Sequence, residues 1–250
     1  MKTNGLLSAL LVVFCFFLNN CSPICCSNCS SVHVKGNGNV ESQEREVKDF
    51  HGVILDGVGS VNIYYADNYK VIVTTDSNIQ EFVTTKTIGN NLLIGQEKID
   101  GNFRVTTLKI DVYLPELNYI SLTGGGKMKI INGKTSDLKI NQSGVGDIEI
   151  QNYEAESLFV TFSGGGNINI DNSGKFYYLE IEHSGVGNIN AEKAEAENVT
   201  INFTGGGAIK TWVTNNLTGT FSGVGSIFYK GNPSTINVNR VGIGVNIIRL

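Results

Sequence analysis

The stretch QSGVGDIEI (142–150) is followed 20 residues later by FSGGGNINI (162–170). Both contain a Ser, a glycine triplet G-x-G and a segment in which polar and apolar residues alternate. The same pattern returns in LTGGGKMKI (122–130), HSGVGNINA (183–191), FTGGGAIKT (203–211), FSGVGSIFY (221–229), the weaker RVGIGVNII (240–248) and the isolated LDGVGSVNI (55–63). From Gly126 to Gly244, the last glycines of successive triplets are 18 to 21 residues apart, and such a short fixed period is typical of a solenoid.

Side chains within each unit alternate with a period of two. Leu158, Val160 and Phe162 face one way, whereas Phe159 and Thr161 face the other, which is typical of a strand with one buried face. Two short strands, a G-x-G corner and a second bend use about 20 residues, the length of one coil of a parallel β-helix. We therefore predict an all-β fold, a single-stranded parallel β-helix with coils of about 20 residues and G-x-G corners.

The outer glycines of each triplet are expected to be structural turn residues, because a sharp corner requires a positive φ or a very close approach of the backbone. They are Gly57, Gly59, Gly124, Gly126, Gly144, Gly146, Gly164, Gly166, Gly185, Gly187, Gly205, Gly207, Gly223, Gly225, Gly242 and Gly244. Between 124–126 and 223–225 the triplets alternate strictly between GGG and GVG. A valine of one coil would then lie against the bare middle glycine of the coils on either side, so that large and small residues alternate along the stack.

The position before the Ser or Thr of each unit forms a mostly apolar column that is expected to point inward. The column reads Leu122, Gln142, Phe162, His183, Phe203 and Phe221. A catalytic or ligand role for His183 is one interpretation, but no Cys, Ser or acid lies at a convincing offset from it. We interpret Gln142 and His183 as polar residues that a backbone group at the corner satisfies.

Two outward columns follow the corner and form a flat ladder of mostly polar side chains. They read Lys127, Asp147, Asn167, Asn188, Ala208, Ser226 and Lys129, Glu149, Asn169, Asn190, Lys210, Phe228. A flat polar sheet suits recognition of a glycan or a protein surface, and it suits plain solubility equally well. Cross-coil ion pairs are expected between Lys127 and Asp147 and between Lys129 and Glu149.

Glycoside cleavage is the enzymatic alternative, because it needs two carboxylates that flank a groove. Asp147 with Glu149, and Glu180 with Glu182, are candidate pairs, but each pair shares one face of one strand. The glycine triplets run into strands rather than helices, so they are not phosphate cradles, and the repeat is longer than that of calcium-binding β-rolls. We predict no catalytic residue, no metal site and no cofactor. The net charge of −4, without a run of Lys or Arg, argues against nucleic acid as a partner.

The N-terminus has the pattern of an export signal. Lys2 precedes a 13-residue apolar run, Leu6 to Leu18, which is too short to span a bilayer comfortably and is typical of a signal peptide. The sequence Leu18-Asn19-Asn20-Cys21 looks like a bacterial lipobox, with Asn20 where Gly, Ala or Ser is usual. We therefore expect cleavage after residue 20 and a lipid on Cys21.

Three parts are expected: a signal peptide (1–20), a tether (21–48) and a β-helical domain (49–250). Within the domain, residues 49–120 form an irregular start that shields the first coil, and residues 121–250 carry the regular repeats. The five cysteines all lie in the first 29 residues. We interpret Cys25, Cys26 and Cys29 as tether thiols, because this short cluster lacks the histidine pair of a zinc site.

Several segments resemble the head GIN domain family of adhesin-like bacterial proteins. They are FHGVILDGVGSVNIYYADNYKVIVTTDSN (50–78), LKIDVYLPELNYISLTGGG (108–126), the S-G-x-G repeats and YKGNPS (229–234). The resemblance covers about residues 48–250. It implies a right-handed β-helix similar to pectin-lyase-like folds, export that is often as a lipoprotein, and a role in adhesion by likeness to autotransporter heads. The family has no established catalytic residues, so none is carried over.

These features together predict a non-enzymatic lipoprotein of the cell envelope, on the outer membrane or cell surface rather than in the periplasm. Its expected partners are the membrane, through the lipid on Cys21, and a glycan or protein on the outward columns. A second copy of the chain could cover the last strand, Val245 to Leu250. The alternatives are a pectin-lyase-like carbohydrate-active enzyme and a periplasmic spacer or sensor.

Overall fold

The computed structural model describes residues 34–97, 103–171, 174–241 and 246–250, and most of these residues belong to β-strands. The expected signal peptide, Cys21, the other four cysteines and the glycines Gly242 and Gly244 lie outside the described residues. In the described part of the chain, no helix is long and apolar enough to cross a membrane.

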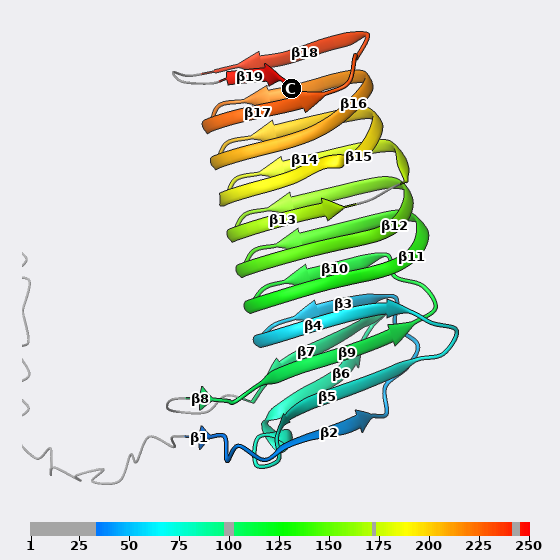
Figure 1. The fold of residues 1–250 in the computed structure, drawn as a ribbon, viewed down its shortest axis with the longest axis vertical. Helices are drawn as coiled ribbons and strands as arrows, with labels where there is room; N and C mark the ends of the chain where they lie inside the picture. Colours follow the sequence, from blue (N-terminus) through cyan, green and yellow to red (C-terminus); the bar gives the residue numbers. More distant parts are fainter. Residues whose placement is uncertain (1–33, 98–102, 172–173, 242–245) are drawn as a thin grey trace, which may run out of the picture. The chain divides into compact units, whose positions relative to one another are not determined.

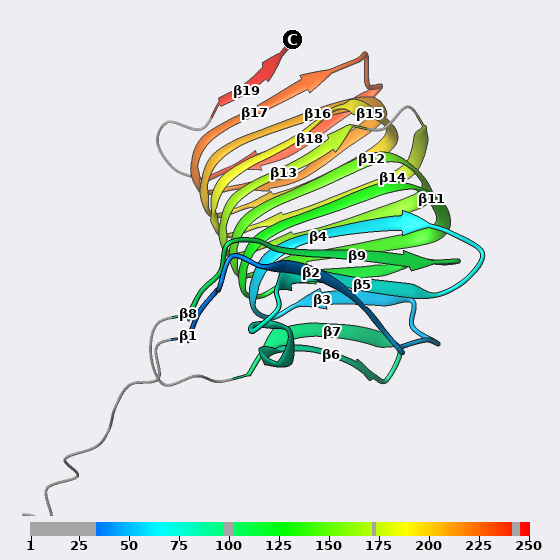
Figure 2. The same cartoon turned by 60° about the horizontal axis from the view of Figure 1, so that its bottom comes forward.

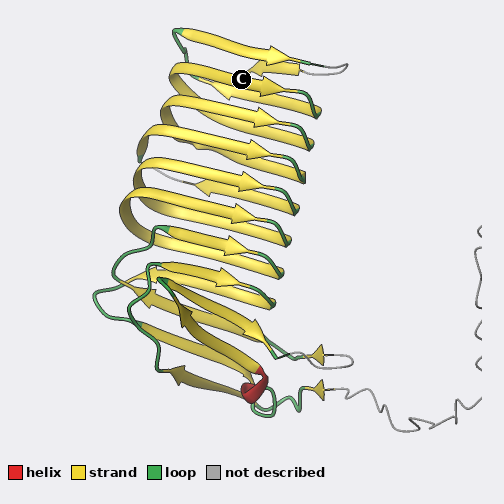
Figure 3. Ribbon diagram, turned by 180° about the vertical axis from the view of Figure 1, so that it is seen from behind, coloured by secondary structure: helices red, strands yellow, loops and turns green. Residues whose placement is uncertain are grey.

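Each regular coil runs from one glycine corner to the next (Figure 1). Single bent strands form the coils β11 (Gly125–Gln142), β12 (Val145–Phe162), β15 (Val186–Phe203) and β16 (Gly206–Phe221). Other coils are divided at the bend, into β13 (Gly165–Asp171) and β14 (Lys175–His183), and into β17 (Val224–Lys230) and β18 (Thr235–Arg240), after which β19 (Asn246–Arg249) follows. Seen from behind, the coils form a regular stack (Figure 3). Neighbouring coils pair in parallel, for example Ile130 with Ile150, so the predicted parallel β-solenoid is confirmed.

Every coil supplies apolar side chains to one continuous core. In β12, Leu158, Val160 and Phe162 are buried while Thr161 is exposed, as the alternation predicts. Burying one such side chain contributes about 1.5–3 kcal/mol to stability. This core replaces disulfides, because the described part of the chain contains no cysteine.

Neighbouring backbones lie so close at the corners that the outer glycines have no room for a side chain. A Cβ on Gly144 would overlap the carbonyl oxygen of Gly124, and one on Gly146 would overlap that of Gly126. Gly146 also has a φ of 149°, which other residues rarely adopt. The middle position differs, because the nearest atom to a Cβ on Gly165 would be 3.9 Å away.

The middle positions of the triplets form a row in which valine and glycine alternate from coil to coil. Val145 pairs with Gly125 on one side and Gly165 on the other, as the alternation of GGG and GVG predicts. The Val145 side chain is 70% exposed, so it lies on the outside of the corner and does not contribute to the hydrophobic core.

The second bend of the coil uses asparagine. Asn132 and Asn152 have φ values of 62° and 52°, a left-handed conformation that asparagine tolerates better than most residues. Next to this bend, the buried Tyr153 donates a hydrogen bond from its hydroxyl to the carbonyl oxygen of Leu117, and burial raises the pKa of Tyr153. The left-handed asparagines thus turn the chain at the bend, and the Tyr153 hydroxyl ties it to the backbone at Leu117.

The first coil comes from a part of the chain far from the other repeats in sequence. β3 (Gly52–Leu55) pairs in parallel with β10 (Tyr119–Leu122), and β4 (Val58–Tyr65) pairs with β11. Gly59 faces Gly126 directly, although they are 67 residues apart. The residues after β4 and before β10 are therefore an insertion between two adjacent coils.

This insertion and an N-terminal strand cover the first coil (Figure 2). β7 (Asn91–Gln96) and β9 (Leu108–Leu114) continue the parallel stack on β3 and β4. Three further strands add antiparallel pairs: β5 (Lys70–Asp76) on β9, β6 (Val83–Ile88) on β7, and β2 (Val40–Arg45) on β5. The 3-10 turn η1 (Gln80–Phe82) and the short pair of β1 (Val34–Lys35) with β8 (Phe103–Arg104) complete this cap.

The cap corrects the expected boundary and regularity of the N-terminal part. Residues 40–45 belong to the sheet, so the folded part begins before residue 49. The expected irregular start is an ordered cap that changes from parallel to antiparallel pairing, and it shields the strand edges of the first coil.

Asp76 fixes the chain at the edge of the cap. Its buried carboxylate accepts hydrogen bonds from the backbone N–H of Gly38 at 2.8 Å, and from the N–H and hydroxyl of Thr106 at 2.7 and 2.8 Å. The hydrogen bond from the Thr106 backbone is the main reason why the pKa of Asp76 is lowered. One side chain thus joins the end of β5 to two loops.

We expect Gly146→Ala to lower the free energy of unfolding by about 3 kcal/mol or more, because the added Cβ would overlap the Gly126 carbonyl and strain the backbone. Gly165→Ala is the matched control and should change it by less than about 1 kcal/mol. Urea unfolding followed by circular dichroism measures both. An equal loss in the two variants would contradict the packing of the corner.

Candidate functional site

The outward columns lie in register along the strands that follow the glycine corners. We call the described side chains of these columns the polar face: Lys127, Asp147, Asn167, Asn188, Ala208, Ser226, Lys129, Glu149, Asn169, Asn190, Lys210 and Phe228. Parallel in-register pairing repeats each position about 4.8 Å from the next, so side chains of successive coils contact one another directly.

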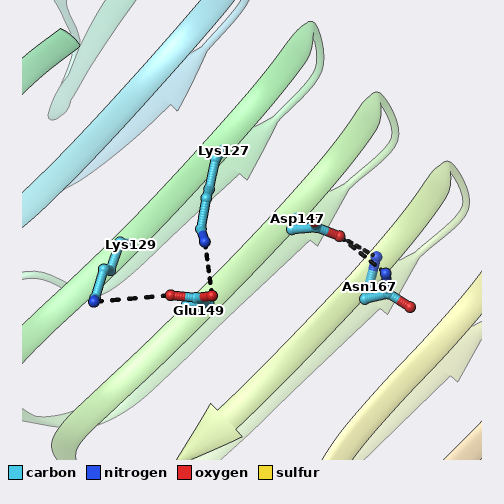
Figure 4. A network of polar contacts seen from close by, with 5 residues as sticks. All are labelled: Lys127, Lys129, Asp147, Glu149 and Asn167. Carbon is cyan, nitrogen blue, oxygen red and sulfur yellow. Dashed lines mark hydrogen bonds and ion pairs between the residues drawn. The ribbon is translucent and has the colours of Figure 1, made fainter.

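The charged end of the polar face differs in one pair from the sequence prediction (Figure 4). Lys127 Nζ lies 2.7 Å from Glu149 Oε1, and Lys129 Nζ lies 3.9 Å from Glu149 Oε2. The expected pair of Lys129 with Glu149 is therefore present, whereas the expected pair of Lys127 with Asp147 is wrong. The long lysine side chain reaches diagonally, and the short Asp147 side chain turns to the next coil instead.

Asp147 begins a ladder of amide side chains. Its Oδ1 accepts hydrogen bonds from both the backbone N–H and the Nδ2 of Asn167, each at 3.0 Å. Asn188 Nδ2 donates to Asn167 Oδ1 at 3.1 Å, and the backbone N–H of Ala208 donates to Asn188 Oδ1 at 3.0 Å. The ladder holds this column of the polar face in one conformation.

The second column borders a hollow of about 230 Å³, which we call the amide hollow. Its polar lining is Glu149, Gln151, Asn169, Asp171, Asn190 and Lys193. Lys193 Nζ lies 2.9 Å from Asp171 Oδ2, and the backbone N–H of Glu192 donates to Asn190 Oδ1 at 3.2 Å. The side chains of Gln151 and Asn169 form no hydrogen bond within the described residues. Two amides therefore keep donors and acceptors for a ligand.

Three of the four candidate carboxylates of a glycosidase, all but Glu180, form other contacts. Both oxygens of Glu149 face lysines, and Asp147 accepts two N–H groups. Glu182 lies on β14, the strand that follows the bend, and its Oε1 accepts a hydrogen bond from Asn202 Nδ2 at 2.7 Å. Among the described residues, no three His, Cys, Asp or Glu side chains gather to hold a metal ion. The polar face therefore offers amide hydrogen bonds to a ligand, while its carboxylates Asp147 and Glu149 are already engaged.

His183 belongs to the core rather than to a ligand site. It is 1% exposed, and its ring lies between those of Phe162 and Phe203, with centroid distances of 4.6 and 4.5 Å. Its Nε2 lies 3.1 Å from the carbonyl oxygen of Gly187, and its Nδ1 has no hydrogen-bond partner among the residues that the structure describes. The expectation that a corner backbone group satisfies this polar residue is confirmed.

Gln142 lies in the same column, and a backbone carbonyl at the corner likewise accepts a hydrogen bond from its buried amide. Its Nε2 donates to the carbonyl oxygen of Gly146, four residues ahead, as His183 contacts Gly187 four residues ahead. A longer contact reaches the carbonyl oxygen of Gly165 at 3.2 Å. Both side chains therefore contact the backbone of the glycine corner inside the solenoid and are not part of the polar face.

A parallel β-solenoid with one ordered polar face is an architecture compatible with an adhesin-like binding protein. The chain belongs to the family described as "Putative auto-transporter adhesin, head GIN domain", whose model matches residues 49–233.

Solved structures of similar proteins agree with this assignment. A "putative adhesin" from Bacteroides fragilis is 26% identical, with a TM-score of 0.82, and covers 87% of this chain and 100% of its own. A "putative adhesin" from Parabacteroides merdae is 24% identical, with a TM-score of 0.72, and covers 87% of this chain and 99% of its own. A "putative lipid binding protein" from Parabacteroides distasonis shares the fold at 22% identity and a TM-score of 0.69. Among curated proteins, none matches the sequence significantly. The family and the Bacteroides fragilis neighbour support an adhesin-like, non-enzymatic role at the cell surface or outside the cell. The two Parabacteroides neighbours show the shared fold.

We expect the stability of the domain to depend on the protonation of His183. Burial lowers the pKa of His183, so the folded state favours the neutral ring. This contribution is complete above the ordinary histidine pKa of about 6.5 and is lost as the pH falls below it. The variant His183→Gln should lose less unfolding free energy than the wild type between pH 7.5 and pH 5, because glutamine does not titrate. Gln142 occupies the same column, so a glutamine side chain fits at this position. Urea unfolding at both pH values measures the difference, and identical pH dependence would contradict the prediction.

Proposed function

We propose that this protein is a lipid-anchored, surface-exposed adhesin whose polar face binds glycans. The amide hollow carries this proposal, because two of its side-chain amides have no partner within the described residues. Sugar hydroxyls donate and accept hydrogen bonds at once, and so do side-chain amides. The adhesin-like family supports recognition rather than catalysis.

Order in the surrounding side chains favours this binding mode. Lys127 and Lys129 hold Glu149, Lys193 holds Asp171, and a backbone N–H holds Asn190. A ligand would therefore meet side chains that already have their conformation, which lowers the entropy lost on binding. The polar face also lies on directly paired strands of adjacent coils, and this backbone pairing favours a fixed spacing between its side chains.

The N-terminal sequence supports the anchor. Lys2, the apolar run to Leu18 and the lipobox-like Leu18 to Cys21 have the order of a bacterial lipoprotein signal. After cleavage, the lipid on Cys21 would hold the protein at the membrane, and the residues before Val34 would separate the solenoid from it.

Protease treatment of intact cells tests surface exposure. We expect the domain to disappear from intact cells, while a periplasmic control protein survives, and Cys21→Ser to release the chain from the membrane fraction. Blotting of whole cells and fractions measures both results. Survival of the domain until the envelope is broken would place it in the periplasm and favour a spacer or sensor.

A glycan array followed by titration tests the polar face. We expect Gln151→Ala combined with Asn169→Ala to weaken binding of the captured glycan roughly tenfold, because each lost hydrogen bond contributes about 0.5–1.5 kcal/mol. Asn237→Ala, an exposed position on β18, is the matched control and should bind like the wild type. Undiminished binding by the double variant would place the glycan elsewhere on the solenoid.

A further inference from the structure

Tyr177 on β14 is an outward aromatic ring that no neighbouring ring or cation covers within the described residues. Its side chain is 65% exposed. Two other outward rings are covered by a neighbouring strand: Tyr64 stacks on Tyr113 at 5.0 Å between centroids, and Lys230 Nζ lies 4.0 Å from the centroid of Trp212. The contrast leaves the face of Tyr177 available to a group from outside the chain.

Carboxylates lie on both sides of this ring along the stack. β14 pairs in parallel with β12 from Tyr178 onward and with β15 on both sides of Tyr177. Continuing this register places the backbones of Glu156 and Glu197 on the two coils next to Tyr177, at about the 4.8 Å spacing of paired strands. Neither carboxylate forms an ion pair within the described residues, although Glu197 acts on Lys175 at longer range. Both glutamates are exposed, as Tyr177 is, so the coils on either side of Tyr177 carry negative charge on the same outer surface.

The surface beside the ring is hollow. A hollow of about 310 Å³ is lined by Lys175, Phe176, Tyr177, Glu195, Glu197 and Thr214. A second hollow, of about 560 Å³, shares Lys175 and includes Glu154, Glu156 and Glu116. We call the two hollows together the bend groove, and it extends along successive coils.

Lys175, which lines both hollows, is not available to neutralise the carboxylates beside Tyr177. Lys175 Nζ lies 2.8 Å from Glu195 Oε1, and the hydrogen bond and charge of Glu195 raise the pKa of Lys175. Its positive charge is thus matched by Glu195. The other charged residues of the lining are Lys134 and four glutamates, Glu116, Glu154, Glu156 and Glu197, so the bend groove has a net negative charge.

We propose that the bend groove binds an extended basic polypeptide, with a lysine or arginine side chain over the ring of Tyr177 between Glu156 and Glu197. A cation is attracted to the negative face of an aromatic ring, and the two carboxylates add charge complementarity. The Lys230–Trp212 contact shows the same pairing within the chain, which favours a lysine side chain as the occupant. This site is separate from the polar face and adds a second partner to the proposed adhesin.

Titration of the purified chain with hexalysine, followed by calorimetry, tests the proposal. We expect binding that Tyr177→Ala weakens roughly tenfold and Tyr177→Phe largely preserves, because phenylalanine keeps the ring. Glu156→Gln combined with Glu197→Gln should weaken binding at least as much. Glu46→Gln combined with Glu81→Gln removes the same charge from exposed positions of the cap, and this control should bind like the wild type. Thermal melting of each variant confirms that it is folded.

Three results would overturn the proposal. They are no measurable binding of hexalysine by the wild type, full binding by Tyr177→Ala, and an equal loss in the cap control, which would mean general attraction to an acidic protein. A glucosamine oligomer serves as the cationic alternative. Tyr177-dependent binding of that oligomer without binding of hexalysine would overturn the assignment to a polypeptide.

Discussion

At the glycine corners, the backbone of one coil lies directly on the backbone of the next. The N–H of Gly144 donates to the carbonyl oxygen of Leu122 at 2.8 Å, and the N–H of Val145 donates to that of Gly124 at 3.0 Å. The same contacts recur at each described corner up to the N–H of Val224, which donates to Gly205. Any side chain on the outer glycines would separate the coils, so this approach sets the register of every other position.

Because the register is fixed at the corner, each outward position becomes a column. Side chains then interact with their own counterparts in neighbouring coils, as in the ladder from Asp147 through Asn167 to Asn188. Continuing the same register places the backbone of Tyr177 on the coil between those of Glu156 and Glu197. The two proposed recognition surfaces of this protein are therefore columns along the stack, and neighbouring columns can have different chemistry. The polar face offers amides, whereas the bend groove offers an aromatic ring and negative charge.

The cap shows how the same chain ends its stack. β4 and β11 are adjacent coils, but the insertion between them adds β5 and β6 in the antiparallel direction. Parallel coils can continue indefinitely, so a change of strand direction is an effective way to end the pairing. Asp76 then holds the loops at the cap edge through hydrogen bonds to Gly38 and Thr106.

The sequence by itself determined the regular half of the solenoid. Period and alternation are local properties, so the repeated G-x-G triplets were enough to predict the coils, the parallel pairing, the inward column of Gln142 and His183, and the outward polar columns. Only the tertiary structure decided three other features: the pairing of Gly59 with Gly126 across the insertion, the antiparallel cap that includes residues 40–45, and the choice of Glu149 over Asp147 by Lys127. These depend on contacts between residues far apart in sequence and on side-chain reach, and a one-dimensional pattern contains neither distance nor direction between such residues.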